Sequence, residues 1–319
     1  MRQIIARALL VAGVLVTSTA QAAWPERPVT IVNPFAPGGI SDVIARLTAA
    51  RLQAAFKQPF IVENVPGAAG TIAADRVIKA APDGYTLIST PIFQLTMAPF
   101  TSNVTFDAGR DFKPISAVAA SPFVITVAGS FPGNTLAEFI SHVKANPGKI
   151  TYGSAGAGSL THISSVVVLK SAGLDMIHVP YRGVAPAFTD LLAGHIATLS
   201  ATPVELKPYL ESGKVKPLAV TGTTRSKHLP NVPTVLETLK SPPVVTYNGL
   251  LAPARTPQDI IDVMSRELVA AGKDAEFVDR LLKAGLEPIL GTPDEFAKII
   301  AADTEQWRDI VRELNLKKQ

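Results

Sequence analysis

A glycine- and serine-rich segment, residues 153–162, is the first place where residue types and spacing could support chemistry. It lies between a β-rich run and a helical pattern. Gly153 and Gly158 have the spacing of a nucleotide P-loop, but that motif requires Lys directly after its second glycine, where Ser159 stands. A dinucleotide fingerprint also fails, because Thr161 occupies the place of its third glycine. The segment therefore predicts neither kind of nucleotide site.

A second segment, residues 30–47, has the same layout. Its β-rich start runs into Pro34, Pro37 and the pair Gly38-Gly39, and a helical pattern follows. The first N–H groups of a helix have no intrahelical partner, and the helix dipole makes that end partly positive. Glycine also lets a ligand approach the backbone closely. Each segment is therefore a predicted anion seat, suited to a small carboxylate, although ordinary βα turns remain an alternative.

Catalysis is a further alternative, because Ser154, Ser159 and His162 lie close together in the sequence. No G-x-S-x-G pentapeptide surrounds either serine. His162 follows Ser159 by three residues on one predicted helix, which makes it a surface neighbour but does not aim it as a base. We expect no catalytic residue and no enzyme activity, and the histidine spacing predicts no metal site and no cofactor. An exported serine hydrolase using Ser159 or Ser154 stays as the alternative.

Other polar residues beside these segments have expected supporting roles. Asp42, near the start of the first predicted helix, can complement the dipole and cap free N–H groups. We expect His162 to order its loop by hydrogen bonding and His178 to be a satisfied core histidine. Arg182 is the strong cation next to the loops and could pair with a ligand carboxylate, while a surface or lobe–lobe salt bridge is the alternative.

The N-terminal 22 residues predict a Sec-type secretory signal peptide. Arg2 and Arg7 precede or flank an apolar run over 8–16, and Ala20-Gln21-Ala22 has the small-x-small pattern of a cleavage site. The apolar run is about half of the ~20 residues that a membrane span needs. We therefore expect cleavage after Ala22, a periplasmic location, and a mature protein that is a soluble monomer.

Composition narrows the class of protein further. The 319-residue chain is long enough for two domains or lobes. It contains no cysteine, which excludes disulfides, zinc-thiolate sites and cysteine nucleophiles. The formal net charge is only +4, and the basic residues are scattered rather than gathered in a stripe, so nucleic acid is not an expected partner.

Strand-like and helix-like patterns alternate along most of the chain. This alternation predicts an α/β fold with parallel sheets covered by helices. Thr135 and Glu138 have the spacing of a capping box at a helix start. Three helices are expected near the end of the chain, at about 257–271, 274–284 and 293–314.

Seven stretches together resemble the TctC/Bug family, the periplasmic substrate-binding receptors of tripartite tricarboxylate transporters. They match in order and spacing and cover essentially all of the mature chain. The stretches are "WPERPVTIVNPFAPGGISDVIAR", "VENVPGAAGTIAADRVIKAAPDGYTLI", "DFKPISAVAASPFVI", "NPGKITYGSAGAGSLTHIS", "HVPYRGVAPAFTDLLAGHI", "GKVKPLAVTGTTRSKHLPNVPTVLE" and "GLLAPARTP". The chain departs from the family pattern at Val166, Arg182 and Tyr247, where Glu, Lys and Trp are common.

The resemblance implies a two-lobed periplasmic binding protein, a Venus-flytrap of type II-like fold with the ligand cleft between the lobes. Lobe 1 would comprise 23–123 and 224–319, and lobe 2 would comprise 124–223, with crossings near Phe123 and Thr223. The resemblance also implies a small carboxylate ligand held by two loops. The residues carried over are Phe35, Gly38, Gly39, Asp42, Ser154, Ala155, Gly156, Gly158, Ser159 and His162, beside which Arg182 is a candidate.

The function implied by the resemblance is that of a periplasmic solute receptor. Such a receptor would bind an organic acid and deliver it to the membrane subunits of a tripartite tricarboxylate-type transporter. A receptor that feeds a membrane signalling sensor stays open as an alternative, because both roles need the same closed form.

Overall fold

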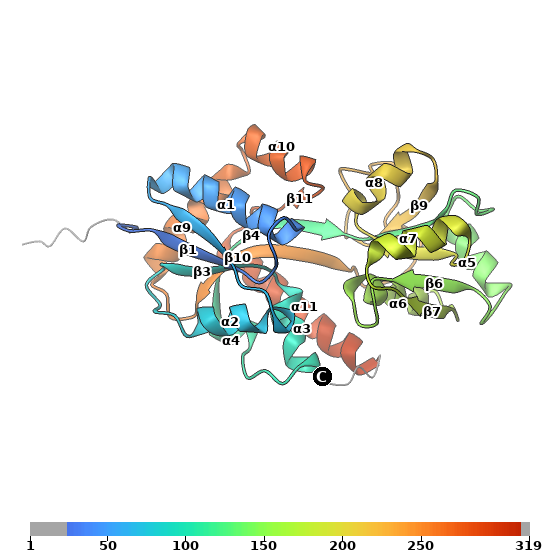
Figure 1. Ribbon diagram of the computed structural model, residues 1–319, viewed down its shortest axis with the longest axis horizontal. Coiled ribbons are helices and arrows are strands. Elements are labelled where there is room, and N and C mark those ends of the chain that lie inside the picture. Colours follow the sequence, from blue (N-terminus) through green and yellow to red (C-terminus); the bar gives the residue numbers. More distant parts are fainter. Residues whose placement is uncertain (1–23, 314–319) are drawn as a thin grey trace, which may run out of the picture.

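The computed structural model of the protein describes residues 24–313, which form two α/β lobes lying side by side (Figure 1). The expected two-lobed α/β fold is confirmed. The predicted signal peptide, residues 1–22, and its cleavage site lie outside the described residues. Across residues 24–313, no helix is both long and apolar enough to cross a bilayer.

Lobe 1 is built on a six-stranded sheet. Its strands have the spatial order β11-β4-β10-β3-β1-β2. In chain order they are β1 (Val29–Asn33), β2 (Phe60–Asn64), β3 (Thr86–Pro91), β4 (Phe112–Pro122), β10 (Val245–Pro253) and β11 (Glu287–Pro288).

Helices cover both faces of this sheet (Figure 1). One face carries α1 (Ile40–Phe56), α9 (Gln258–Ala271) and α10 (Ala275–Lys283); the other carries α2 (Thr71–Ile78), α3 (Phe93–Thr101), the short α4 (Ala108–Asp111) and α11 (Pro293–Glu313). Ile31 and Leu250 are buried under α1 and α9, and Ile88 and Leu251 are buried on the opposite face. The three helices expected near the end of the chain are thus present.

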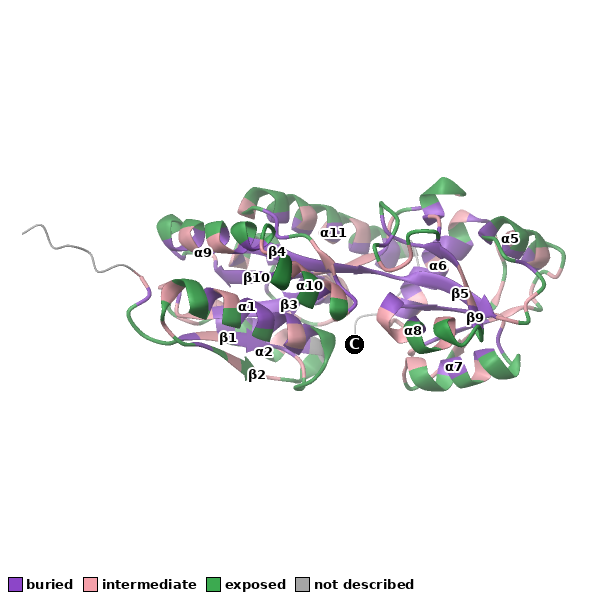
Figure 2. Cartoon of the chain, turned by 90° about the horizontal axis from the view of Figure 1, so that it is seen from above, coloured by how far each residue is buried: buried purple, intermediate pink, exposed green. Residues whose placement is uncertain are grey.

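Lobe 2 is built on a five-stranded sheet of order β7-β6-β8-β5-β9. Its strands are β5 (Val124–Ala128), β6 (Thr151–Ser154), β7 (Ile177–Pro180), β8 (Thr198–Ala201) and β9 (Val215–Val220). Its helices are α5 (Leu136–Lys144), α6 (Leu160–Ser171), α7 (Val184–Ala193) and α8 (Pro203–Glu211). The predicted capping box is confirmed at the start of α5, where Thr135 and Glu138 bond each other's backbone N–H. Buried residues line both sheets (Figure 2).

The sheets are mixed, which corrects the expectation of parallel sheets. In lobe 1, β10 is antiparallel to both β3 and β4. In lobe 2, β5 is antiparallel to both β8 and β9. The physical reason is the connection between the lobes, because strands that carry the chain out of a lobe and back must run in opposite directions.

The chain crosses between the lobes at two places. The first crossing is at Phe123, between the end of β4 and the start of β5. After β9 the chain stays with lobe 2, where Thr234 bridges Val220 and Val235 lies in the core. It returns to lobe 1 as β10 at Val245, later than the Thr223 expected from the sequence. Much of the segment 224–244 therefore packs on lobe 2.

An apolar cluster also joins the lobes on one side of the crossing strands. Ile163 and Val167 of α6 pack with Trp307 and Ile310 of α11. Side chains of α3 border the same cluster. Helix α6 is therefore anchored to lobe 1 along its length, while its N-terminus remains at the end of β6.

Candidate ligand-binding site

Strand direction decides which loops of lobe 1 face lobe 2. Strand β4 runs from lobe 1 into lobe 2, where the chain continues as β5. Strand β10 is antiparallel to β4 and to β3, and β3 is parallel to β1, which is parallel to β2. The carboxyl ends of β1, β2 and β3 therefore point toward lobe 2.

The same reasoning places the loops of lobe 2. Strand β5 runs away from lobe 1, β8 is antiparallel to β5, and β6 is parallel to both β7 and β8. The carboxyl ends of β6, β7 and β8 therefore point toward lobe 1. Residues 34–39, after β1, and residues 155–159, after β6, lie at the facing ends of the two lobes (Figure 1). Ligands of open α/β sheets bind at this end of the strands.

The two predicted segments occupy equivalent positions in the two sheets. Strand β1 lies between β2 and β3, as β6 lies between β7 and β8. The strand beyond β3 is β10, and the strand beyond β8 is β5. Each is antiparallel to its neighbour and lies at a crossing between the lobes. The similar layout noted in the sequence therefore corresponds to a similar place in each lobe.

In lobe 1, helix α1 begins without a side-chain cap. Gly39 is its N-cap residue, and Gly38 has a φ of 89°, which favours glycine. The N–H groups of the first three helical residues, 40–42, have no hydrogen-bond acceptor among residues 24–313. This helix end can therefore receive an anion from outside the loop.

Asp42 holds the first loop in place. The side chain is buried, with 3% of the residue exposed. Its carboxylate accepts hydrogen bonds from Gly38 N at 3.0 Å, Arg46 Nε at 2.8 Å and Asn64 Nδ2 at 2.9 Å. Burial alone would raise the pKa of Asp42, but these hydrogen bonds outweigh it and lower the pKa to about 2. Asp42 thus accepts a hydrogen bond from a backbone N–H group, as expected, and its carboxylate stays ionised at neutral pH.

Two asparagines fix the backbone around Phe35. Asn64 Nδ2, at the end of β2, donates to the Phe35 carbonyl at 2.8 Å. Ser41 Oγ of α1 donates to Asn33 Oδ1 at 2.7 Å. The loop between β1 and α1 is therefore tied to a neighbouring strand and to its own helix, which keeps the free N–H groups in place.

In lobe 2, Ser159 is the N-cap of α6. Its hydroxyl accepts from His162 N at 3.3 Å and donates to the Gly156 carbonyl at 2.7 Å. Ser159 is a candidate nucleophile from the sequence alone. In the structure its hydroxyl caps α6 and bonds the loop backbone. The N–H groups of Leu160 and Thr161, in the first turn of α6, have no acceptor within the described part of the chain.

Most other N–H groups of the second loop are bonded within it. The N–H groups of Ala155, Gly156 and Gly158 donate to Thr161 Oγ1 at 2.8 Å, Ser154 Oγ at 3.2 Å and His162 Nδ1 at 3.1 Å, respectively. These residues therefore shape the loop, and the unpaired donors of the seat lie in the first turn of α6.

Two histidines pack together behind this loop. The rings of His162 and His178 are stacked with centroids 3.9 Å apart, and Tyr152 stacks on His178 at 5.0 Å. Burial, with a smaller effect of His178, lowers the pKa of His162 to about 4. Burial also lowers the pKa of His178. His162 is therefore neutral at pH 7, and its Nδ1 accepts from Gly158, which is the ordering role expected for it.

Ser154 and His178 form a pair, with Oγ 2.7 Å from Nε2. Such a distance would suit a nucleophile and its base. However, Ser154 is only 1% exposed, and its hydroxyl also bonds the Gly156 carbonyl at 3.0 Å. No carboxylate among the described residues hydrogen-bonds His178 to orient it. The pair therefore has the features of a structural contact.

Arg182 lies in the loop after β7, beside the second glycine loop. A Cβ placed on Gly156 would lie 3.5 Å from the carbonyl oxygen of Tyr181. The Arg182 side chain is exposed and has no hydrogen bond or ion pair with any other residue that the structure describes. It is available to a ligand.

Arg182 is also the one charged side chain in the six loops that lie at the lobe–lobe face. The loops that follow the six strands ending at the lobe–lobe face are 34–39, 65–70, 92, 155–159, 181–183 and 202. Of these residues, Arg182 alone is charged. Unpaired N–H groups and a single cation make this face selective for anions.

Sequence reasoning missed the loop after β2. A Cβ on Gly70, which has a φ of 90°, would lie 3.3 Å from Cβ of Pro34. The loop 65–70 therefore packs against the first glycine loop and belongs to the same face. The signal was present, because Gly67 and Gly70 precede a helix that starts at Thr71, as in the two segments that were recognised.

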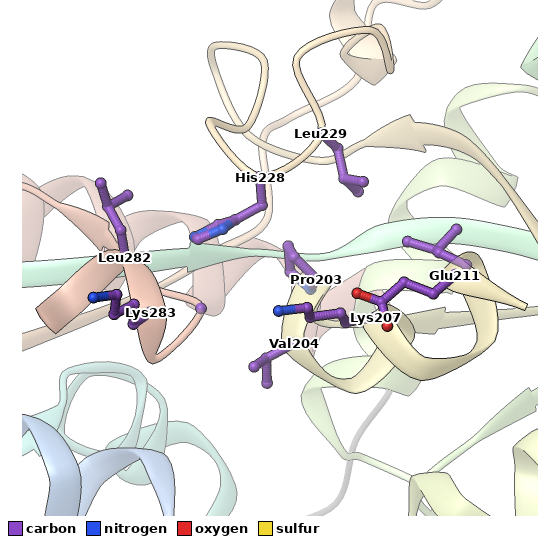
Figure 3. Close-up of a pocket in the computed structure, with 10 residues that line it drawn as sticks. Pro203, Val204, Lys207, Glu211, His228, Leu229, Leu282 and Lys283 are labelled. Carbon is purple, nitrogen blue, oxygen red and sulfur yellow. The ribbon is translucent and has the colours of Figure 1, made fainter. Parts of the chain in front are cut away.

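A pocket of about 380 Å³ between the lobes lies apart from these loops (Figure 3). Pro203, Val204 and Lys207 of α8 line one side, and Leu282 and Lys283 of α10 line the other. None of the site residues predicted from the sequence lines it. It marks a second contact between the lobes.

Comparison with known proteins agrees with the two-lobed fold. The family model "tripartite tricarboxylate transporter family receptor" (TctC) matches residues 44–316. Protein BugT of Bordetella pertussis is 32% identical over 324 residues, which span 98% of this chain and 98% of BugT. R. palustris Rpa4515 with adipate has a TM-score of 0.76 at 30% identity, covering 93% of this chain and 100% of that one. MatC from Rhodopseudomonas palustris with bound malate has a TM-score of 0.71 at 32% identity, covering 90% and 99%. The chain therefore belongs to the TctC family of tripartite tricarboxylate transporter receptors.

Proposed function

We propose that this protein is a periplasmic receptor that binds a small carboxylate between its lobes and presents it to a tripartite tricarboxylate-type transporter in the membrane. The observation that carries the proposal is the pair of equivalent loops at the facing ends of the lobes. Unpaired N–H groups begin α1 and α6 there, and Arg182 is the one charged side chain of the six facing loops.

The ligand contacts follow from the roles of the loop residues. The carboxylate binds the free N–H groups that begin α1 on one side and those that begin α6 on the other, and Phe35, Gly38 and Gly39 form the loop beside it in lobe 1. Asp42, Ser154 and His162 hold the loops in shape. Ala155, Gly156, Gly158 and Ser159 form the surface against which the ligand lies, and Arg182 pairs with its charge.

The free energy available is sufficient for useful affinity. About four hydrogen bonds to a carboxylate contribute roughly 1.5–3 kcal/mol each. Two helix ends add about 1 kcal/mol each. Association costs several kcal/mol, at least ~4, in lost freedom of motion. The sum is therefore about 4–10 kcal/mol, and its upper part reaches the roughly 8 kcal/mol of a micromolar dissociation constant.

Two relatives support a carboxylate as the ligand class. Rpa4515 is described with adipate and MatC with malate, and both cover nearly the whole chain. Both of these molecules are small dicarboxylates. A seat built from backbone N–H groups recognises the carboxylate itself, so the proposal names this class and no single member.

The protein acts without catalysis on this proposal. The hydroxyl groups of Ser154 and Ser159 both donate hydrogen bonds to the Gly156 carbonyl within the loop. Turnover of an ester or amide that is lost in Ser154→Ala or Ser159→Ala would favour the hydrolase alternative instead.

Export is the remaining part of the proposal. Residues 1–22 act as a Sec-type signal peptide that is cleaved after Ala22, and the mature protein is a soluble periplasmic monomer. The intact mass of protein purified from the periplasm tests this, because the mature chain should begin at Ala23. A chain that keeps residues 1–22 would contradict it.

The function is tested by identifying what the protein binds. Mass spectrometry of small molecules released from the purified protein should find an organic acid. In thermal-shift assays, a cognate carboxylate at a hundredfold excess over its dissociation constant should raise the midpoint by about 5 °C, while its neutral amide should not. No released acid and no shift with any carboxylate would contradict the proposal.

A further inference from the structure

The α1 face of the lobe 1 sheet changes from apolar to polar at its lobe–lobe end. Along this face the core side chains are apolar, as at Ile31 and Leu250. The residues that follow on the same face toward lobe 2 are polar and buried: Asn33, Ser89, Asn248 and Ser121. A buried polar patch at this end of the sheet lies directly beneath the loops of the proposed site.

Strand register places Asn248 and Ser121 on this face. Along β10, Leu250 and Ala252 pack under α1 and α9, whereas Tyr247 and Leu251 pack on the opposite face. Side chains alternate between the faces of a strand, so Asn248 points to the α1 side. Thr246 lies on that side too, and it is paired directly with Ser121 of β4.

Asn248 and Ser121 are buried without hydrogen-bond partners. Asn248 is 2% exposed and Ser121 is 3% exposed. Neither Asn248 Oδ1 nor Ser121 Oγ has a partner among the described residues. Leaving a buried polar atom unpaired costs free energy, so two on one face need a reason.

Comparable polar side chains elsewhere in the protein are paired. In lobe 2, Ser164 Oγ lies 2.8 Å from Ser200 Oγ, and Thr198 Oγ1 donates to the Thr126 carbonyl at 2.8 Å. Asn33, on the same face as Asn248, accepts from Ser41. Other buried atoms without a partner include Thr48 Oγ1, but Asn248 and Ser121 are distinguished by lying on the paired strands that cross between the lobes.

We propose that Asn248 and Ser121 form a second subsite that binds a hydroxyl group of the ligand. This inference rests on the proposed carboxylate receptor and narrows its ligand class to hydroxy acids. The hydroxyl donates a hydrogen bond to Asn248 Oδ1 and accepts one from Ser121 Oγ. The carboxylate of the same molecule remains at the start of α1.

The spacing fits a small hydroxy acid. Asn248 is directly opposite Ala119, which makes Ser121 its diagonal neighbour across the strands. Such neighbours are about 7–8 Å apart, so both side chains reach one atom between them. Asn248 lies two strands from β1, a distance of about 10 Å, and α1 begins above β1. A compact acid with two or more functional groups spans that distance.

A hydroxyl suits the subsite better than an ammonium group. A cation buried there would need a carboxylate partner. Asp42, at the start of α1, and Glu287, which is paired with Ala120 of β4, both have carboxylates already occupied by hydrogen bonds from other groups of the protein. The subsite is uncharged, and a hydroxyl supplies both the donor and the acceptor that its two atoms require.

Matched ligand pairs test the subsite directly. Isothermal titration compares malate with succinate, lactate with propionate, and citrate with tricarballylate, each pair differing by one hydroxyl. The wild-type protein should bind the hydroxy member of at least one pair roughly tenfold more tightly.

Two variants remove the subsite while preserving the fold. Asn248→Leu replaces an unpaired polar group with an apolar one of similar volume, which proteins tolerate well. Asn248→Leu and Ser121→Ala should each reduce the hydroxyl preference to about twofold or less, while affinity for the deoxy ligand changes by about threefold at most. Thr48→Val is the control, because Thr48 Oγ1 is also buried and unpaired but belongs to α1 and not to either of the strands that cross.

The outcomes separate this inference from the function on which it rests. If carboxylates bind but no pair shows a hydroxyl preference, or if Asn248→Leu keeps the wild-type ratio, the subsite is wrong and the receptor function stands. An equal loss of preference in Thr48→Val would also overturn the subsite. If no carboxylate binds the wild-type protein, the receptor function fails and this inference fails with it.

Discussion

Nδ1 of His162 lies 3.1 Å from the backbone nitrogen of Gly158 and accepts its hydrogen bond. The histidine belongs to the first turn of α6, and the glycine belongs to the loop that precedes it. The contact closes the second glycine loop onto its own helix. It exists only while Nδ1 carries no proton, so loop shape is linked to the ionisation of His162.

Acidification should therefore weaken the protein in a defined pH range. Burial lowers the pKa of His162 from 6.5 to about 4, so the folded state favours the neutral ring. The stabilisation is complete above pH 6.5 and is lost as the pH falls from 6.5 toward 4. Between pH 7 and pH 4.5, the midpoint of thermal unfolding of the wild type should fall relative to that of His162→Gln, which keeps an acceptor but cannot titrate.

Asp303 titrates in the same pH range, but its protonation on acidification stabilises the folded state instead of weakening it. Burial raises its pKa to about 6, against the hydrogen bonds from Thr96 and Trp307. Since this effect is common to the wild type and His162→Gln, the difference between their pH profiles isolates His162. Parallel profiles for the two proteins would contradict the role of His162 in stability.

Ser159→Asp should abolish carboxylate binding in a folded protein. Aspartate is as good an N-cap as serine, so α6 keeps its cap. The new negative charge would stand beside the bound carboxylate, and a loss of at least about 100-fold in affinity is expected from like-charge repulsion. Ser159→Asn is the matched control, because it caps the helix without the charge and should bind within about tenfold of wild type. Equal affinity in the two variants by isothermal titration would refute the placement of the anion.

Asp42→Asn should destabilise the protein much more than a similar change at a surface pair. The Asp42 carboxylate is almost fully buried and accepts three hydrogen bonds, so we expect a loss of about 2–4 kcal/mol in the free energy of unfolding. Asp75→Asn is the control. Asp75 also pairs with a cation four residues on, Lys79 at 3.7 Å, but it is exposed, and its loss should cost under about 1 kcal/mol. Urea titration of both variants measures the difference, and similar losses would show that Asp42 is not an anchor.

Arg182→Gln should weaken carboxylate binding without affecting stability. The side chain is exposed and has no partner among residues 24–313, so its removal breaks no contact within the fold. A charge-assisted pair contributes roughly 1.5–3 kcal/mol, so the dissociation constant should rise about 10- to 100-fold. Arg182→Lys should recover part of the loss. The variant should also lose much of the salt dependence of binding. Unchanged affinity in Arg182→Gln would remove this residue from the site.

Local sequence signals predicted the parts of the structure that depend on local physics. Glycine before a helix start located both loops, and Thr135 with Glu138 located a helix boundary. The sequence patterns did not predict strand β4, because small residues interrupt its few branched and aromatic residues. The return of the chain at Val245 was also misplaced, because it depends on how Thr234 and Val235 pack on lobe 2.

The proposed hydroxyl subsite could not be seen in the sequence for a different reason. Asn248 and Ser121 are far apart in the chain and meet only through the antiparallel pairing of β10 with β4. That register contains two irregularities, each of which changes which residues share a face. No periodic pattern in one segment carries this information.

Isothermal titration of the purified mature protein with malate, succinate and adipate tests the central claim most directly. We predict saturable one-to-one binding of at least one of them at micromolar or lower concentration, with no product formed and with binding lost in folded Ser159→Asp and Gly156→Asp. Absence of binding for every carboxylate, or wild-type affinity in either folded variant, would contradict a carboxylate held between the two glycine loops.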